Sequence, residues 1–348
     1  MHGLRKGLLW FFTLWGVVTL VFLLFFGLSS DAVESALGQN SDEKTRQAIR
    51  TKWGLDQPLS VQYLQTLNRL SPVGFHPTDS TSLEFSGVWI WKGDEKGCML
   101  KWPYLGKSFQ NNRSVSDLLM ESLPGTAILA LSAIGIALIL GLALGGITAW
   151  KQGTWLDRAL VGISTLGISI PSYLAAVLAA FFLGYWWHDA TGLPISGSWM
   201  DYDVWEGKHI AWKNLVLPAF TLGIRPLAVV LQMSRSSFLE TYSMDYIRTA
   251  RAKGLSEWAV FRWHVLRNSM APVVTTITGW LASLLAGAVF VETIFGWKGL
   301  GKLTVDALNA SDLPVLMGIV LLVSILFMFL QALTDRIHRW IDPRIREE

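Results

Sequence analysis

Basic side chains gather in one short stretch of an otherwise apolar sequence. The stretch from Asp245 to Asn268 reads DYIRTARAKGLSEWAVFRWHVLRN and contains only two acids, Asp245 and Glu257, against five cations: Arg248, Arg251, Lys253, Arg262 and Arg267. Guanidinium and ammonium groups form charge-assisted hydrogen bonds with acidic groups of other proteins. Because the stretch lies between two apolar segments and is too polar for lipid, we expect it to project at the membrane face that favours Lys and Arg.

Two short helices around a glycine are predicted to position these cations. Tyr246 to Lys253 consists of helix-forming residues, and Gly254 can adopt the left-handed conformation that ends a helix. Ser256 can cap a second helix that runs to about Arg267. A helix, glycine, helix element of this kind indicates a docking surface, and the alternative is a solvated basic loop that only orients the protein in the membrane.

The composition indicates a membrane protein. Of 348 residues, 51% are hydrophobic and only 16% are charged, which is too apolar for an ordinary soluble domain. Six runs of about 20 residues or more are free or nearly free of charge, enough for each to cross roughly 30 Å of hydrocarbon as a helix. They are Leu8 to Leu28, Leu123 to Trp150, Ala159 to Trp187, Leu215 to Ser234, Ser269 to Val291 and Leu313 to Thr334. We therefore predict an all-α polytopic membrane protein with six transmembrane helices.

The distribution of Lys and Arg predicts the orientation. With the N-terminus inside, the inner segments hold 14 basic residues in 63 positions, and the outer segments hold 14 in 142. This bias places both termini in the cytoplasm. The predicted organisation is an N-terminal transmembrane helix (1–28), a long extracytoplasmic segment after the first span (29–122), a five-helix core (123–334) with a cytoplasmic loop (235–268), and a cytoplasmic tail (335–348).

The extracytoplasmic segment gives weaker signals. Apolar residues at helical spacing predict a helix within 54–67, whereas 70–102 is rich in Ser, Gly, Pro and Trp and has no clear period. A further amphipathic helix is expected to start at Ser114 or Ser116 and to end before Pro124. Cys98 is the single cysteine, so no intrachain disulfide can form. The segment could pack on the pore mouth or could form a docking surface for another protein.

Several residues inside the apolar runs suggest packing or a pathway. Gly141, Gly145 and Gly146 have the spacing that lets helices approach closely. Pro171 removes a backbone hydrogen bond and can kink its helix, so it is a candidate gate element. Arg225 lies about midway along its run, where a charge must face a polar interior or reach the interface. It could line a translocation pathway, or it could lie near the outer edge if the helix starts only after Pro226.

The loop also carries a resemblance to a known family. It resembles the glycine-centred cytoplasmic loop of ABC importer permeases, with the pattern E-A-A, three residues, G, nine residues, I-x-L-P. Counted from Gly254, the Glu, Ile and Pro of that pattern are absent, and His264 stands at the Ile position. RTARAKGL followed by H-x-L-RN is instead similar to the B-type permease of the dipeptide and oligopeptide branch.

A second motif supports the same resemblance. The segment ETIFGWKGLG is similar to the family's E-T-x-F-x-W-P-G-L-G turn, with Lys298 in place of proline, and it predicts an outer turn built on Glu292, Gly299 and Gly301. Gly296 to Lys302 also approaches a phosphate-binding loop. Leu303 stands where that motif needs Ser or Thr, no strand precedes it and the topology places it outside, so no nucleotide site is predicted.

The resemblance implies a type I ABC importer permease fold in the inner membrane. It further implies a second homologous permease subunit, two ABC ATPase subunits that bind ATP and Mg, an extracytoplasmic solute-binding protein, and a peptide substrate. In such an assembly the ATPase contacts would come from Arg248, Thr249, Ala250, Arg251, Ala252, Lys253, Gly254, Leu255, Ser256, Glu257 and His264. We expect contacts with membrane lipid and none with nucleic acid. The chain is expected to be no enzyme, with no cofactor or metal of its own.

Other functions remain open at this point. The same fold could import nickel or another small solute instead of a peptide. An ATP-independent carrier or channel is a different class, and it should carry acidic or His residues inside several spans. Arg225 is the only charged residue inside the predicted spans that stands out, which disfavours proton coupling.

Overall fold

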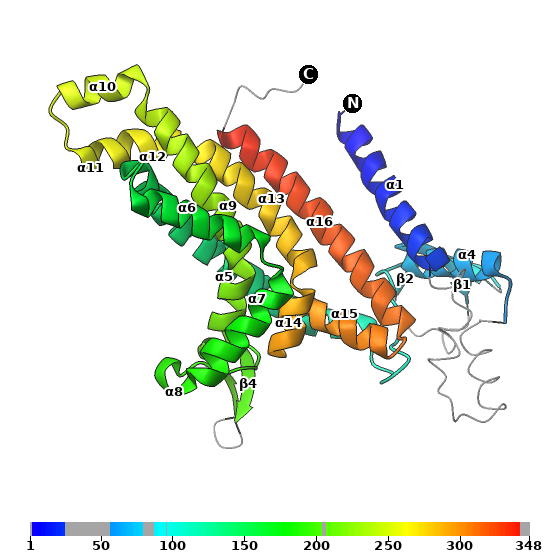
Figure 1. The fold of residues 1–348 in the computed structure, drawn as a ribbon. Helices are drawn as coiled ribbons and strands as arrows, with labels where there is room; N and C mark the ends of the chain where they lie inside the picture. Colours follow the sequence, from blue (N-terminus) through cyan, green and yellow to red (C-terminus); the bar gives the residue numbers. More distant parts are fainter. Residues whose placement is uncertain (1, 25–55, 79–86, 95, 204–206, 342–348) are drawn as a thin grey trace. The chain divides into compact units, whose positions relative to one another are not determined.

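A computed structural model describes residues 2–24, 56–78, 87–94, 96–203 and 207–341 of the chain. It is mostly helical, as predicted, and its elements are shown in Figure 1. The chain divides into two compact units, Met1–Glu121 with Leu303–Ile325, and Ser122–Lys302 with Leu326–Glu348. Residues 29–55, 79–86 and 95 of the predicted extracytoplasmic segment 29–122 and residues 342–348 of the predicted tail 335–348 lie outside the described residues, as does the end of the first apolar run.

The second unit holds most of the helices. Its elements are the greater part of α5 (Val115–Trp150), α6 (Trp155–Ser169), α7 (Ser172–Ala179), η3 (Ala180–Trp186), α8 (His188–Thr191), α9 (Trp212–Tyr242), α13 (Met270–Gly287) and α14 (Val289–Phe295). Buried Leu, Ala, Val and aromatic residues from α5, α7, α9 and α14 form one core. The short elements α10 to α12 lie between α9 and α13.

The glycines of α5 perform the predicted packing role. A Cβ atom at Gly141 would lie 2.7 Å from a methyl carbon of Val230, and one at Gly145 would lie 1.9 Å from the Ser234 hydroxyl. Both neighbours are on α9. Helices α5 and α9 therefore approach closely along this face, and any side chain larger than hydrogen would separate them.

Proline has different effects in three helices. The predicted kink at Pro171 is confirmed, since the axis turns by 107° between α6 and the α7–η3 pair. Pro226 instead lies inside the continuous helix α9. The predicted helix end before Pro124 is wrong, because α5 continues through that residue. A proline removes only one N–H, and neighbouring helices can satisfy the freed backbone groups in a membrane protein.

Three described helices are long and apolar enough to cross a membrane, namely Val115–Trp150, Trp212–Tyr242 and Leu313–Ile337, or up to four if the pair bent at Pro171 forms one span. The described parts of the first and fifth expected spans, Gly7–Phe22 and Met270–Leu281, are shorter apolar helices. The count of six spans therefore stays a prediction.

The first unit contains a small sheet, so the prediction of an all-α chain is wrong in detail. It comprises α1 (His2–Phe22), α4 (Leu59–Leu70), β1 (Val73–Pro77), β2 (Gly87–Lys92), β3 (Lys96–Lys101) and the first part of α16 (Leu313–Ile341). The three strands pair antiparallel in the order β1-β3-β2. A second hairpin, β4 (Met200–Asp203) with β5 (Gly207–Ile210), belongs to the other unit. The helix expected within 54–67 is present as α4.

The end of the predicted extracytoplasmic segment packs against the start of α16. The buried Asp312 carboxylate accepts a hydrogen bond from the Ser108 hydroxyl, and its other oxygen accepts one from the Phe109 N–H at 3.1 Å. Val115, at the start of α5, would contact a Cβ atom at Gly318 at 2.5 Å. Within the first unit, these contacts favour the packing interpretation of residues 104–115.

Candidate functional site

The basic loop folds as two helical pieces around Gly254. Helix α10 (Asp245–Ala252) precedes the glycine, which has a φ of +82°, and α11 (Glu257–Val260), η4 (Phe261–Val265) and α12 (Leu266–Asn268) follow it. The Ser256 hydroxyl accepts a hydrogen bond from the Ala259 N–H at 3.3 Å and caps α11. The predicted helix, glycine, helix element and its serine cap are confirmed.

One face of this element is buried within the second unit. Ile247 and Ala250 of α10 pack with Val260, Val265 and Phe238, all of them nearly inaccessible to solvent. Ala250 is therefore part of the loop's own core, and its contact with an ATPase stays a prediction. The hydrophobic effect holds the helices against Ala149 of α5 and Phe238 of α9, so the loop packs as a compact body.

The opposite face is open. Residues 251–258 are all exposed, and Arg248 and Thr249 are exposed as well. The Arg251 guanidinium donates two hydrogen bonds to the Glu257 carboxylate, at 2.8 Å and 3.1 Å, and so links α10 to α11 across the glycine. Hydrogen bonding to Glu257 raises the pKa of Arg251 above its usual value. His264 is half-buried, and its backbone carbonyl accepts a hydrogen bond from Asn268.

Two polar contacts that the sequence analysis missed fasten the loop at its ends. The Thr241 hydroxyl near the end of α9 and the Ser269 hydroxyl directly before α13 are hydrogen-bonded at 2.7 Å in a buried position. Arg235 in the C-terminal part of α9 makes a bidentate pair with buried Asp157, at 2.7 Å and 2.9 Å. The sequence predicted only that Asp157 and Arg235 lie in segments on the same side of the membrane. Their spacing in the sequence did not indicate that they form a pair.

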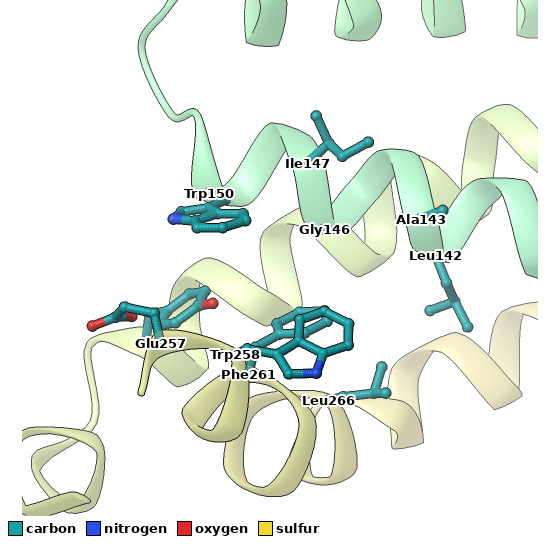
Figure 2. A pocket seen from close by; sticks show the side chains of 10 residues that line it. Leu142, Ala143, Gly146, Ile147, Trp150, Glu257, Trp258, Phe261 and Leu266 are labelled. Carbon is teal, nitrogen blue, oxygen red and sulfur yellow. The ribbon is translucent and has the colours of Figure 1, made fainter. Parts of the chain in front are cut away.

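A pocket of about 360 Å³ opens between α5 and the second helical piece of the loop. In Figure 2 Trp150 lies on the α5 side of this space, and Trp258 and Phe261 lie on the other side. The lining is largely apolar, and its residues are Leu142, Ala143, Gly146, Ile147, Trp150, Tyr242, Glu257, Trp258, Phe261 and Leu266. No sequence pattern predicted this pocket.

The residues of the predicted outer turn come together around Glu292. The Glu292 side chain is fully buried, and its carboxylate accepts hydrogen bonds from the Thr126 hydroxyl at 2.6 Å and the Lys302 N–H at 3.0 Å. A Cβ atom at Gly299 would lie 2.5 Å from this carboxylate, and one at Gly301 would lie 2.5 Å from Val289 Cα. Only glycine fits at either position.

Neighbouring contacts fix the same turn. The indole N–H of buried Trp297 donates to the Gly125 carbonyl at 2.9 Å. The Lys298 N–H donates to the Ser198 hydroxyl at 3.2 Å, a bond that the proline usual at this position in the resembled motif could not make. The replacement of proline by lysine therefore has a local structural role.

The two residues predicted for a pathway lie apart from the loop. Arg225 is within α9 and its side chain is exposed, so the alternative that the helix starts only after Pro226 is wrong. Pro171 is at the bend between α6 and α7, and its side chain is also exposed. A charge on the surface of an apolar helix needs a polar surrounding beyond this chain. Arg225 lies within α9 and Pro171 lies at the N-terminus of α7, so the two residues belong to different helices.

The comparison with protein families decides the assignment. Residues 141–347 match the family described as binding-protein-dependent transport system inner membrane component. This chain belongs to that family. Residues 4–78 match the N-terminal model of the same transport systems. The loop around Gly254, the outer turn and α9 all lie within the first match.

Individual relatives and structures agree with the family. The chain is 33% identical over 335 residues to a putative peptide transport system permease protein of Brucella abortus, covering 95% of this chain and 94% of the relative. It is 32% identical over 352 residues to the dipeptide transport system permease protein DppB of Escherichia coli, covering 96% and 95%. An inward-facing MetNI methionine ABC transporter structure is similar with a TM-score of 0.53 at 18% identity, covering 65% of this chain and 97% of that one. This last similarity shows the fold, a permease fold of ABC importers.

Proposed function

We propose that the chain is one of two permease subunits of an ATP-driven importer for dipeptides and oligopeptides in the inner membrane. The names of its relatives, which cover nearly the whole chain, support peptide as the cargo. The partners in this proposal are a second permease, two ABC ATPases that bind ATP and Mg, and an extracytoplasmic solute-binding protein. The chain would cross the membrane six times with both termini in the cytoplasm, and would have no ATPase site of its own.

The observation that carries the mechanism is the contrast between the two faces of the loop 235–268. Its buried face is packed against α5 and α9, and the exposed face presents Arg248, Thr249 and Lys253. An ATPase that holds the exposed face can therefore displace α9 and α13 together, because the Thr241 to Ser269 hydrogen bond joins the end of α9 to the start of α13. Such a displacement would switch the access of the cavity between the two sides of the membrane.

The test is affinity purification of the detergent-solubilised chain, with mass spectrometry of the proteins that come with it. Gly254→Val places a β-branched residue at a φ of +82°, so the exposed face should distort and the ATPase should be lost while the second permease remains. Gly192→Val is the matched control, because Gly192 also has a positive φ and open space around it but lies after α8, outside the loop. If Gly254→Val retains the ATPase and normal uptake, the loop is not the coupling element.

We also propose that Arg225 faces the translocation pathway, where its guanidinium would meet the peptide carboxylate. Its exposure on α9 and the cost of a charge at membrane depth support this role. Arg225→Ala should raise the half-saturation concentration for peptide uptake about tenfold, which corresponds to about 1.4 kcal/mol. Unchanged uptake kinetics for every peptide tested would exclude the role, and Arg225→Lys should recover part of the loss.

A further inference from the structure

The mechanism proposed above assigns no role to the pocket between α5 and the second helical piece of the loop, which comprises α11, η4 and α12. Its volume of about 360 Å³ is in the range of small-molecule pockets, roughly 300–1,000 Å³. The walls are mostly Leu, Ile, Ala and aromatic side chains, and Glu257 and Tyr242 are the lining residues with polar side-chain oxygens. An apolar space of this size suits a flexible hydrocarbon chain.

The surface around the pocket has the composition of a membrane interface. Two of the lining residues, Trp150 and Trp258, are 68% and 64% exposed. Trp263, the next tryptophan in the sequence after Trp258, is 62% exposed. The exposed positions of η4 and α12 also include Arg262 and Arg267, while Val260 and Val265 point into the core. Exposed tryptophan and arginine side chains within one short segment are typical of elements that lie at a membrane interface. Helix α10 differs, since its exposed side chains include Arg248 and Thr249 and no tryptophan.

The rim carries one group of each charge. Glu257 lines the pocket, and its partner Arg251 lies with its guanidinium carbon 5.6 Å from the ring of Tyr242, another lining residue. The positive group can bind a phosphate and the negative group an ammonium. An aminophospholipid headgroup carries these two charges a short distance apart, so the rim is complementary to it.

We propose that this pocket binds one acyl chain of an aminophospholipid from the adjoining leaflet, with the phosphate at Arg251 and the ammonium at Glu257. The chain would fill the space between Trp150 and Trp258 and so brace the second helical piece against α5 (Figure 2). Arg248, Thr249 and Lys253 would still be open to an ATPase. The inference does not depend on which solute the protein transports.

The experiment uses the full chain, with the subunits that purify with it, in liposomes containing phosphatidylethanolamine that bears a diazirine on its acyl chain. After illumination, peptide mapping by mass spectrometry locates the adducts. We expect adducts on residues 142–150 and 257–266 in the wild type. Ala143 is an exposed lining residue, so Ala143→Trp can fill the pocket without disturbing the core. It should reduce these adducts about tenfold, equivalent to about 1.4 kcal/mol.

The control variant is Ile139→Trp, which adds the same side chain at an exposed position of α5 outside the pocket. It should leave the adducts at wild-type yield, and adducts on exposed Phe327 and Phe329 of α16 serve as the internal reference in all samples. Equal yields for Ala143→Trp and Ile139→Trp, or no enrichment over α16 in the wild type, would overturn the site. Replacing phosphatidylethanolamine by phosphatidylglycerol, which has no ammonium, should lower the yield, and an equal yield would overturn the headgroup assignment.

Discussion

The loop around Gly254 and the turn around Glu292 both depend on glycine, but for opposite reasons. Gly254 has a φ of +82° and nothing within 4 Å of the place where a Cβ atom would be. Gly301 has no positive φ, and a Cβ atom there would lie 2.5 Å from Val289 Cα. The loop uses glycine for a backbone conformation that leaves its surface open. The turn uses glycine because neighbouring atoms lie so close that no Cβ atom fits.

Their charged groups differ in the same way. Arg251 and Glu257 of the loop form an ion pair with 42% and 51% of their side-chain surface exposed. Glu292 of the turn is fully buried and is bound by a hydroxyl and by backbone N–H groups. An exposed pair can exchange partners at small cost, whereas a buried carboxylate with fixed donors cannot. The loop is therefore suited to meeting another molecule and the turn to holding α5 and α14 together.

Replacing the buried carboxylate should have the largest effect. Glu292→Leu would leave the Thr126 hydroxyl and the Lys302 N–H buried without their acceptor, and each such group costs about 1–3 kcal/mol. We expect a large drop in the apparent melting temperature in detergent, or loss of the folded chain. Glu240→Leu, at an exposed position of α9, is the control and should change the melting temperature little. Equal stability of the two variants would mean that the turn is not locked by Glu292.

The glycines themselves provide the next test. Gly301→Ala would force a backbone contact apart, and overpacking of this kind costs about 1–3 kcal/mol. Gly254→Ala meets no atom, so only the left-handed backbone is penalised, by about 1–2 kcal/mol. The melting temperature should therefore fall more for Gly301→Ala, while association with the ATPase should fall only for Gly254→Ala. The reverse pattern of association would contradict the roles assigned to the two regions.

The sequence predicted the features that depend on local chemistry. Gly254, Ser256 and the helix-forming run before them determine the shape of the loop through backbone preferences, and these act within a few residues. Glu292, Gly299 and Gly301 were recognised only through a resemblance, and the reason for that motif became clear in the contacts among the three. Spacing alone could not have placed a carboxylate against two glycines.

What could not be predicted depends on neighbours distant in the sequence. The pair Asp157 and Arg235 joins residues 78 apart, and Thr241 meets Ser269 across the loop. The strands within 70–102 were missed because hydrophobicity does not follow burial in them: β2 is exposed on both faces, and β1 buries Gly74 and His76 while it exposes Val73 and Phe75. The helix end predicted before Pro124 was wrong because the helix-breaking tendency of proline is outweighed by packing in the folded chain.

The smallest effect on stability is expected for the exposed ion pair of the loop. Glu257→Gln removes the charge that holds Arg251 across Gly254, and exposed pairs contribute only about 0.2–1 kcal/mol. Glu121→Gln is matched to it, because Glu121 pairs with Arg113 at a similarly exposed position outside the loop. The two variants should have nearly the same melting temperature, but only Glu257→Gln should weaken association with the ATPase, because it frees α11 from α10 on the docking face. If both variants bind the ATPase as the wild type does, the exposed pair contributes only to the folding of the loop. The charged groups would then no longer distinguish the function of the loop from that of the turn, and only the roles of their glycines would.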